Sequence, residues 1–287
     1  MADTSILDLG KLGEPFKVLI EKAFNTGEGI FRPFQIKRIA KAEAEADKIK
    51  AHSKMEIEMN ELQYKAMMRM LVEETRNQEN IEAIAQKAIP ELTENSQPQN
   101  VDPDWTVNFF DKCKITSDEQ MQALWAKVLA GETNSPGSFS KRTVNFLAGL
   151  EKQDAELFTK LCSFIWDIGR PTPLIYDPRD EIYKRYDMNF DSLQYLSEIG
   201  LLNFSSIGEL QLGITPEKFV SVSYFKTVYQ FKTPQSINTF SGGKATLSKI
   251  GEELAPIAGA SPIPEFADYI LQEWRKRGYI ILNNWIV

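Results

Sequence analysis

Apolar residues recur at helical spacing near the start of the chain. In residues 14–31 they share one face, and Pro15 stands where the first turn of a helix tolerates proline. That face, with the phenylalanine just beyond it, consists of Phe16, Leu19, Ile20, Phe24 and Phe31. The basic pair Lys37 and Arg38 follows, which makes an acidic bilayer surface one candidate partner. Interspersed glutamates offset the positive charge, so we expect segment 1–34 to pack against a helix or a second subunit instead.

A long helical pattern follows. Residues 35–89 contain no Gly or Pro and are rich in residues that favour helix, and an unbroken helix of that length would measure about 80 Å. Such a helix is stable in water only when it packs an apolar face. We therefore predict a helical arm over 35–90 that folds back as a hairpin or pairs with a second copy of the chain. The candidate self-association residues are Met55, Met59, Leu62, Met67 and Met70.

The middle of the chain predicts a helical core. Residues 91–103 are polar, contain two prolines and indicate a linker. Helices are expected at 104–115, from 117 to 131, at 140–150 and at 153–168, and we group them as a core over 104–170. Ser117 and Gln120 form a capping box for the second of these helices, and Gly131 suits its C-terminal end.

The pattern changes in residues 171–287. A helix is expected at 190–199, a hairpin of 200–204 with 209–212, a strand at 219–231, helices at 245–257 and 264–277, and a closing strand at 279–282. A helix followed by such a hairpin is typical of winged-helix domains. The expected fold is therefore mainly α, with a long N-terminal helical arm, a helical core and an α+β, winged-helix-like C-terminal region.

Composition narrows the possible functions. The chain has 287 residues, a net charge of −7, two cysteines and a single histidine, His52. The negative charge makes nucleic acid an unfavourable partner, and one histidine leaves little room for zinc sites or histidine-based triads. Few cysteines, the acidic N-terminus and the absence of a long apolar run predict a cytoplasmic protein, with the inner membrane face as an alternative site of attachment.

Two short motifs resemble chemical sites but depart from their patterns. Residues 241–246 (SGGKAT) lack the first glycine of a phosphate loop and have Ala245 where a hydroxyl should bind magnesium, so we expect a strand-to-helix turn. Residues 177–184 cluster acids and a lysine after a proline-rich turn, with a spacing that nucleases do not use. Cys113 and Cys162 are expected to be buried thiols. We predict no catalytic, cofactor-binding or metal site.

Three stretches resemble a family of bacterial proteins that is defined only as a domain of unknown function. They are residues 124–132 (LWAKVLAGE) with 136–140 and Thr143, residues 29–43, and residues 247–254 (LSKIGEEL). Similar N-terminal segments occur in abortive-infection alpha-type proteins, which are associated with bacterial defence against phage. The resemblance implies a role in defence but assigns no residue to catalysis.

Together these observations predict a non-enzymatic interaction protein that self-associates through residues 35–90 and acts in phage defence. One alternative is a winged-helix DNA-binding regulator, although the expected recognition helix at 190–199 contains no Lys or Arg. The other is a membrane-surface effector that acts through the N-terminal amphipathic segment. The protein partner is not indicated by the sequence.

Overall fold

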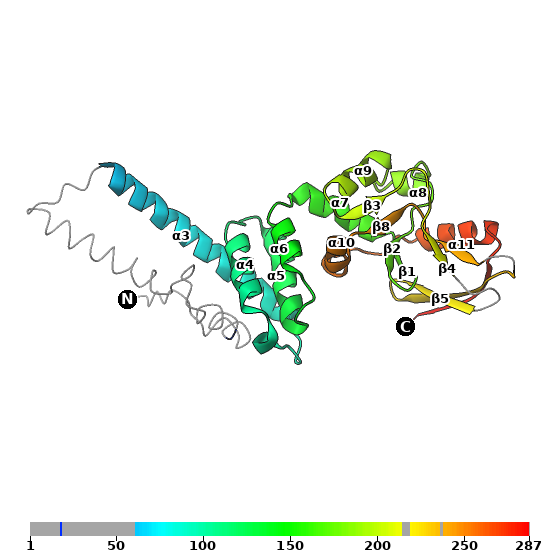
Figure 1. The fold of residues 1–287 in the computed structure, drawn as a ribbon, viewed down its shortest axis with the longest axis horizontal. Coiled ribbons are helices and arrows are strands. Elements are labelled where there is room, and N and C mark those ends of the chain that lie inside the picture. Colours follow the sequence, from blue (N-terminus) through cyan, green and yellow to red (C-terminus); the bar gives the residue numbers. More distant parts are fainter. Residues whose placement is uncertain (1–17, 19–60, 214–218, 236–237, 287) are drawn as a thin grey trace, which may run out of the picture. The chain divides into compact units, whose positions relative to one another are not determined.

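The computed structural model describes residues 61–213, 219–235 and 238–286, together with Val18 (Figure 1). The chain divides into two compact units, Met1–Gly149 and Leu150–Val287. Apart from Val18, the predicted amphipathic segment 1–34 lies outside the described residues, as does the first part of the predicted arm. In the described residues no helix is both long and apolar enough to cross a bilayer.

The first unit is helical. Its elements are α3 (Glu61–Ala88), the 3-10 turns η1 (Ile89–Glu91) and η2 (Pro98–Asn100), α4 (Pro103–Cys113), α5 (Glu119–Asn134) and α6 (Lys141–Leu147). The second half of α3 packs along α5, and α4 packs against α6. The Phe109 ring joins α4 to α5, because it stacks on Trp105 at 5.1 Å and meets the edge of Trp125 at 5.2 Å between ring centroids.

Helix α5 differs from its prediction at both ends. Its N-cap is Asp118, whose carboxylate accepts the backbone N–H groups of Gln120 and Met121, so the predicted capping box at Ser117 does not form. The helix also continues through Gly131, which therefore does not end it. Glycine is required there for space: a Cβ at position 131 would lie 2.5 Å from Cε2 of Phe139, whose ring is buried against the helix.

The second unit is α+β. Its elements are α7 (Lys152–Cys162), β1 (Ile165–Asp167), β2 (Pro171–Pro173), α8 (Glu181–Lys184), α9 (Phe190–Glu198), β3 (Leu202–Phe204), β4 (Gln211–Gly213), β5 (Phe219–Tyr224), β6 (Thr227–Lys232), β7 (Thr239–Ser241), β8 (Ala245–Leu247), α10 (Lys249–Leu254), η3 (Ala255–Ile257), α11 (Phe266–Lys276) and β9 (Ile280–Ile286). An antiparallel sheet has the order β2-β1-β5-β6-β9. Trp274 of α11 packs on the buried face of this sheet, with its ring centroid 5.0 Å from that of Trp166 and 5.2 Å from that of Phe231.

The predicted mainly α fold is therefore wrong, because this five-stranded sheet makes the chain α+β. The helix expected over 153–168 ends at Cys162, and a turn with Gly169 at φ +94° folds β1 onto β2. The single strand expected over 219–231 is a hairpin, β5 and β6, which turns at Phe225 (φ +50°). Periodicity cannot distinguish a short buried strand from the end of a helix.

The predicted winged-helix hairpin is also absent. Strand β3 pairs with β8 and β4 pairs with β7, so segments 202–213 and 239–247 form one interrupted antiparallel ribbon. Residues 205–210 bulge opposite 242–244, and the backbone of Leu210 bridges the gap by hydrogen bonds to Gly242 and Gly243. The helix expected at 245–257 accordingly begins only after β8, with Ser248 as the N-cap of α10.

Candidate functional site

The first half of α3 contains several large apolar side chains that are exposed. Residues 61–79 contain no buried side chain, and burial begins at Asn80. Figure 1 shows this half of α3 extending beyond α4, α5 and α6. Leu62 is 70% exposed and Met70 is 62% exposed, although both are large apolar residues. An exposed cluster of this kind is typical of a surface that binds a partner.

The exposed residues continue the helix face that is buried further along. Residues of an α-helix turn by about 100° per position, so side chains three or four residues apart share a face. Leu62, Ala66 and Met70 follow each other at four-residue steps. The same face continues, after a polar turn, as Ile81, Ile84 and Ala88, which are buried. One face of α3 therefore enters the core at one end and is exposed at the other.

A buried polar network holds the second half of α3 in place. The Asn80 amide donates to the backbone carbonyl of Lys114 at 2.8 Å and to the Ser117 hydroxyl at 3.2 Å. Gln122 donates to the Asn80 side-chain oxygen at 3.3 Å, and Lys87 donates to Gln122 at 2.9 Å. Because hydrogen bonds need specific partners, this network determines the position of α3 along α5 and hence which residues extend beyond it.

The predicted self-association residues divide between two parts of the chain. Leu62 and Met70 are exposed on α3 and Met67 is half-buried, whereas Met55 and Met59 lie outside the described residues. The predicted membrane or partner residues, Phe16, Leu19, Ile20, Phe24 and Phe31, also lie outside them. The predicted set does not include Tyr64, Met68 and Val72, which are also exposed and follow each other at four-residue steps on another face of α3.

The acidic cluster at 177–184 consists of local contacts. Arg179 donates to both carboxylate oxygens of Asp177, at 3.0 and 2.8 Å, and these hydrogen bonds lower the pKa of Asp177 to about 2. Asp180 accepts the Tyr269 hydroxyl at 2.6 Å, and Lys184 pairs with Glu181. Among the described residues, no group of three His, Cys, Asp or Glu side chains is placed to hold a metal ion.

The glycine-rich segment 241–246 runs from the last residue of β7 into β8, so it joins two strands and the expected strand-to-helix turn is not found there. Gly243 has φ +78°, and a Cβ at this position would lie 2.7 Å from the backbone oxygen of Ile175. Beside it, Arg277 donates to Glu209 at 2.9 Å and lies over the Tyr176 ring. Arg277 is the last of three consecutive basic residues, 275–277, and its ion pair could not be located from the sequence because the two partners are 68 positions apart.

The two cysteines are buried, and no disulfide joins them. Burial raises the pKa of both the Cys113 and the Cys162 thiol, because the charged thiolate loses its hydration. Both thiols therefore stay protonated at neutral pH and are weak nucleophiles.

The LWAKVLAGE stretch is built around a carboxylate that the sequence analysis did not single out. Glu132 is 2% exposed and accepts the backbone N–H groups of Gly137 at 2.7 Å and Phe139 at 2.9 Å. The Phe139 carbonyl in turn accepts the indole N–H of Trp105 at 2.7 Å. The motif thus joins α5, the following turn and α4, which is a role in folding.

Comparison with known proteins identifies a family. Residues 64–271 match the family described as "Protein of unknown function (DUF2806)". Neither the curated proteins nor the solved structures include a match. The family match covers well over half of the 287 residues and includes α3 from Tyr64 onwards, the LWAKVLAGE stretch and most of the sheet. The chain therefore belongs to this family of proteins of unknown function.

Proposed function

We propose that this protein is a non-enzymatic interaction protein that self-associates through the first half of α3. The observation that carries the proposal is the apolar face of Leu62, Met67 and Met70, two members of which are more than half exposed. Covering such side chains stabilises an assembly by roughly 25 cal/mol for each Å² of apolar surface removed from water. A second copy of the chain is the partner because the same helix supplies a matching surface.

The charges of α3 favour an antiparallel pair. Residues 61–70 contain two basic side chains, Lys65 and Arg69, and one acidic side chain, whereas residues 71–79 contain three glutamates and one arginine. Antiparallel packing about Met70 brings the basic half of each helix beside the acidic half of the other. Parallel packing would place like charges together, which is unfavourable.

Light scattering on the full chain tests the proposal. We expect a dimer or larger assembly for the unmodified protein, and a monomer for the triple variant Leu62→Gln, Met67→Gln and Met70→Gln. Glutamine keeps the helix propensity close to that of Leu and Met, so circular dichroism should be unchanged. The control is Tyr64→Gln, Met68→Gln and Val72→Gln, which removes exposed apolar side chains from other faces of the helix and should remain associated.

Charge reversal tests the orientation. The double variant Lys65→Glu and Arg69→Glu should weaken association, and adding Glu73→Lys and Glu74→Lys should restore it. A monomeric unmodified protein at micromolar concentration would refute self-association. If the added substitutions Glu73→Lys and Glu74→Lys do not restore association, only the antiparallel arrangement is refuted.

The biological setting belongs to the same proposal. The resemblance of the N-terminal segments to abortive-infection alpha-type proteins supports a role in anti-phage defence in the bacterial cytoplasm. The test compares the survival of phage-challenged cells that express either the unmodified protein or the triple glutamine variant. Equal survival would show that defence does not depend on self-association.

The two alternative functions remain predictions. Membrane attachment depends on segment 1–34, and liposome co-sedimentation of the full chain tests it. For DNA binding, the predicted winged-helix hairpin does not form, because β3 and β4 pair with β8 and β7. The expected recognition helix, α9, contains the exposed acidic residues Asp191 and Glu198.

A further inference from the structure

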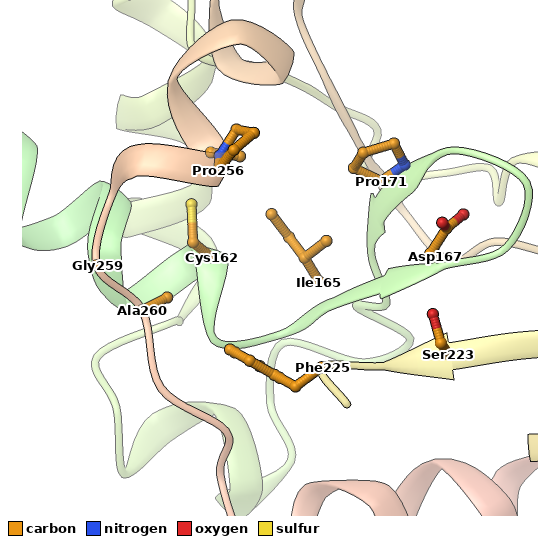
Figure 2. A pocket seen from close by; sticks show the side chains of 10 residues that line it. Cys162, Ile165, Asp167, Pro171, Ser223, Phe225, Pro256, Gly259 and Ala260 are labelled. Carbon is orange, nitrogen blue, oxygen red and sulfur yellow. The ribbon is translucent and has the colours of Figure 1, made fainter. Parts of the chain in front are cut away.

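A hollow of about 510 Å³ lies in the second unit, where the end of α7, strands β1, β2 and β5, the turn η3 and the chain that follows η3 meet (Figure 2). Its wall is mostly apolar and includes Ile165, Pro171, Phe225 and Pro256. Figure 2 shows Asp167 and Ser223 together at one end, with Cys162, Gly259 and Ala260 at the other. Volumes of this size, with few polar groups in an apolar wall, are typical of ligand sites.

The alternation of side chains along β1 creates the hollow. Ile165 and Asp167 lie on the side of the strand that lines it. Trp166 lies on the opposite side, where it is fully buried and stacks on Tyr224 at 5.1 Å between ring centroids. Because α11 covers only that opposite face, the side of β1 and β5 with the hollow remains accessible.

The polar end of the hollow is negatively charged. Asp167 and Ser223 are direct cross-strand partners of β1 and β5, which places their side chains next to each other. One carboxylate oxygen of Asp167 accepts the Gly169 N–H at 3.0 Å, and no described cation pairs with the carboxylate. Asp167 is also the single charged residue among the described residues that line the hollow. A cationic group would therefore complement this end.

We infer that the hollow binds an arginine side chain of a partner protein. The aliphatic stem of arginine would pack on Ile165 and Pro171, as long basic side chains do on apolar surfaces. Its guanidinium would donate to the Asp167 carboxylate and the Ser223 hydroxyl. Phe225, whose side chain is 41% exposed, offers a ring for guanidinium stacking, which favours arginine over lysine. This site lies in the second unit and is independent of the proposed self-association through α3.

Titration of the full chain, labelled at the δ1 methyl groups of isoleucine, tests the inference by NMR. N-acetyl-arginine amide is compared with N-acetyl-citrulline amide, which has the same shape without the charge, and with N-acetyl-norleucine amide, which is apolar. We expect the arginine compound to shift the Ile165 methyl signal with millimolar affinity and the other two to bind more weakly. Equal shifts with arginine and citrulline, a stronger effect of norleucine, or no shift at all would overturn the inference.

Two variants locate the contacts. Asp167→Asn should weaken binding of the arginine compound by up to roughly fivefold, the effect of one exposed charged contact. Asp191→Asn makes the same change on α9, away from the hollow, and should leave binding unchanged. Phe225→Leu should weaken binding of the arginine compound and leave norleucine unaffected. Loss of affinity with Asp191→Asn, or none with Asp167→Asn, would contradict the assigned site.

Discussion

At position 131 a glycine lies inside α5, where alanine would ordinarily favour the helix by about 1 kcal/mol. The Phe139 ring occupies the space that a side chain at this position would need. Phe139 is held there because its N–H donates to Glu132 and its carbonyl accepts the Trp105 indole. Tertiary packing therefore explains why position 131 is glycine, although alanine would favour the helix locally.

We expect Gly131→Ala to destabilise the first unit by about 1–2 kcal/mol, because overpacking in a core outweighs the gain in helix propensity. Gly149→Ala is the control, since the nearest heavy atom to a Cβ at that position is 3.8 Å away. Chemical denaturation followed by circular dichroism measures both. A stabilised Gly131→Ala protein would show that the Phe139 ring moves aside freely.

The Glu209–Arg277 ion pair predicts a pH dependence. Burial raises the pKa of Glu209, but hydrogen bonds from Arg277 and Ser241 outweigh it, and the net pKa lies below the ordinary value of 4.5. A carboxyl whose pKa is lowered by folding stabilises the protein above its unfolded pKa, and this stabilisation is lost as the pH falls through the folded pKa.

We therefore expect Glu209→Gln to lower the free energy of unfolding by about 1–2 kcal/mol near neutral pH. The difference from the unmodified protein should shrink as the pH falls below 4.5, the ordinary pKa of glutamate. Urea denaturation across this pH range measures the difference. Glu156→Gln, at an exposed position of α7, should have little effect at any pH.

At the scale of elements, α3 is one helix with two environments. Its residues from Asn80 onwards are fixed by the network with Lys114, Ser117 and Gln122. Residues 61–79 of the same helix contain no buried side chain. Helical periodicity predicts the apolar face but does not say where the face leaves the core. That point is determined by where α5 begins, near Glu119, and by the polar network.

We expect Asn80→Ala to destabilise the first unit by about 1–2 kcal/mol, because the part-buried Lys114 carbonyl loses this donor and the Gln122 amide keeps only its hydrogen bond to the Thr116 carbonyl. Asn77→Ala is a matched control one turn earlier. The Asn77 side-chain oxygen has no hydrogen-bond partner and its amide makes only a 3.5 Å contact with Glu74. Thermal unfolding should separate the two variants; equal losses would show that the network contributes little.

At the scale of the whole molecule, each unit buries its own aromatic core. Trp105, Phe109 and Trp125 form the core of the first unit, and the cluster around Trp166 and Trp274 forms that of the second. A domain with its own core can fold alone. We expect a chain of residues 150–287 to unfold cooperatively by both circular dichroism and tryptophan fluorescence. A gradual transition without cooperativity would contradict this expectation.

The sequence by itself determined the features that depend on local preference. The run without Gly or Pro predicted a helix, and from residue 61 onwards the structure contains this helix as α3. Amphipathic spacing predicted α4, α9 and α11 close to their observed bounds. Of the candidate self-association residues, Leu62 and Met70 are exposed in the structure, and their role in association stays a prediction. These features follow from contacts between residues three or four positions apart.

The tertiary structure decided what depends on distant partners. Residues 165–167 became a strand because β2 and β5 were available to pair with them, and β3 paired with β8 instead of with its neighbour β4. The hollow beside Asp167 exists because four separate segments meet there. Strand pairing is a contact between residues far apart in sequence, so local periodicity does not predict which strand will be the partner.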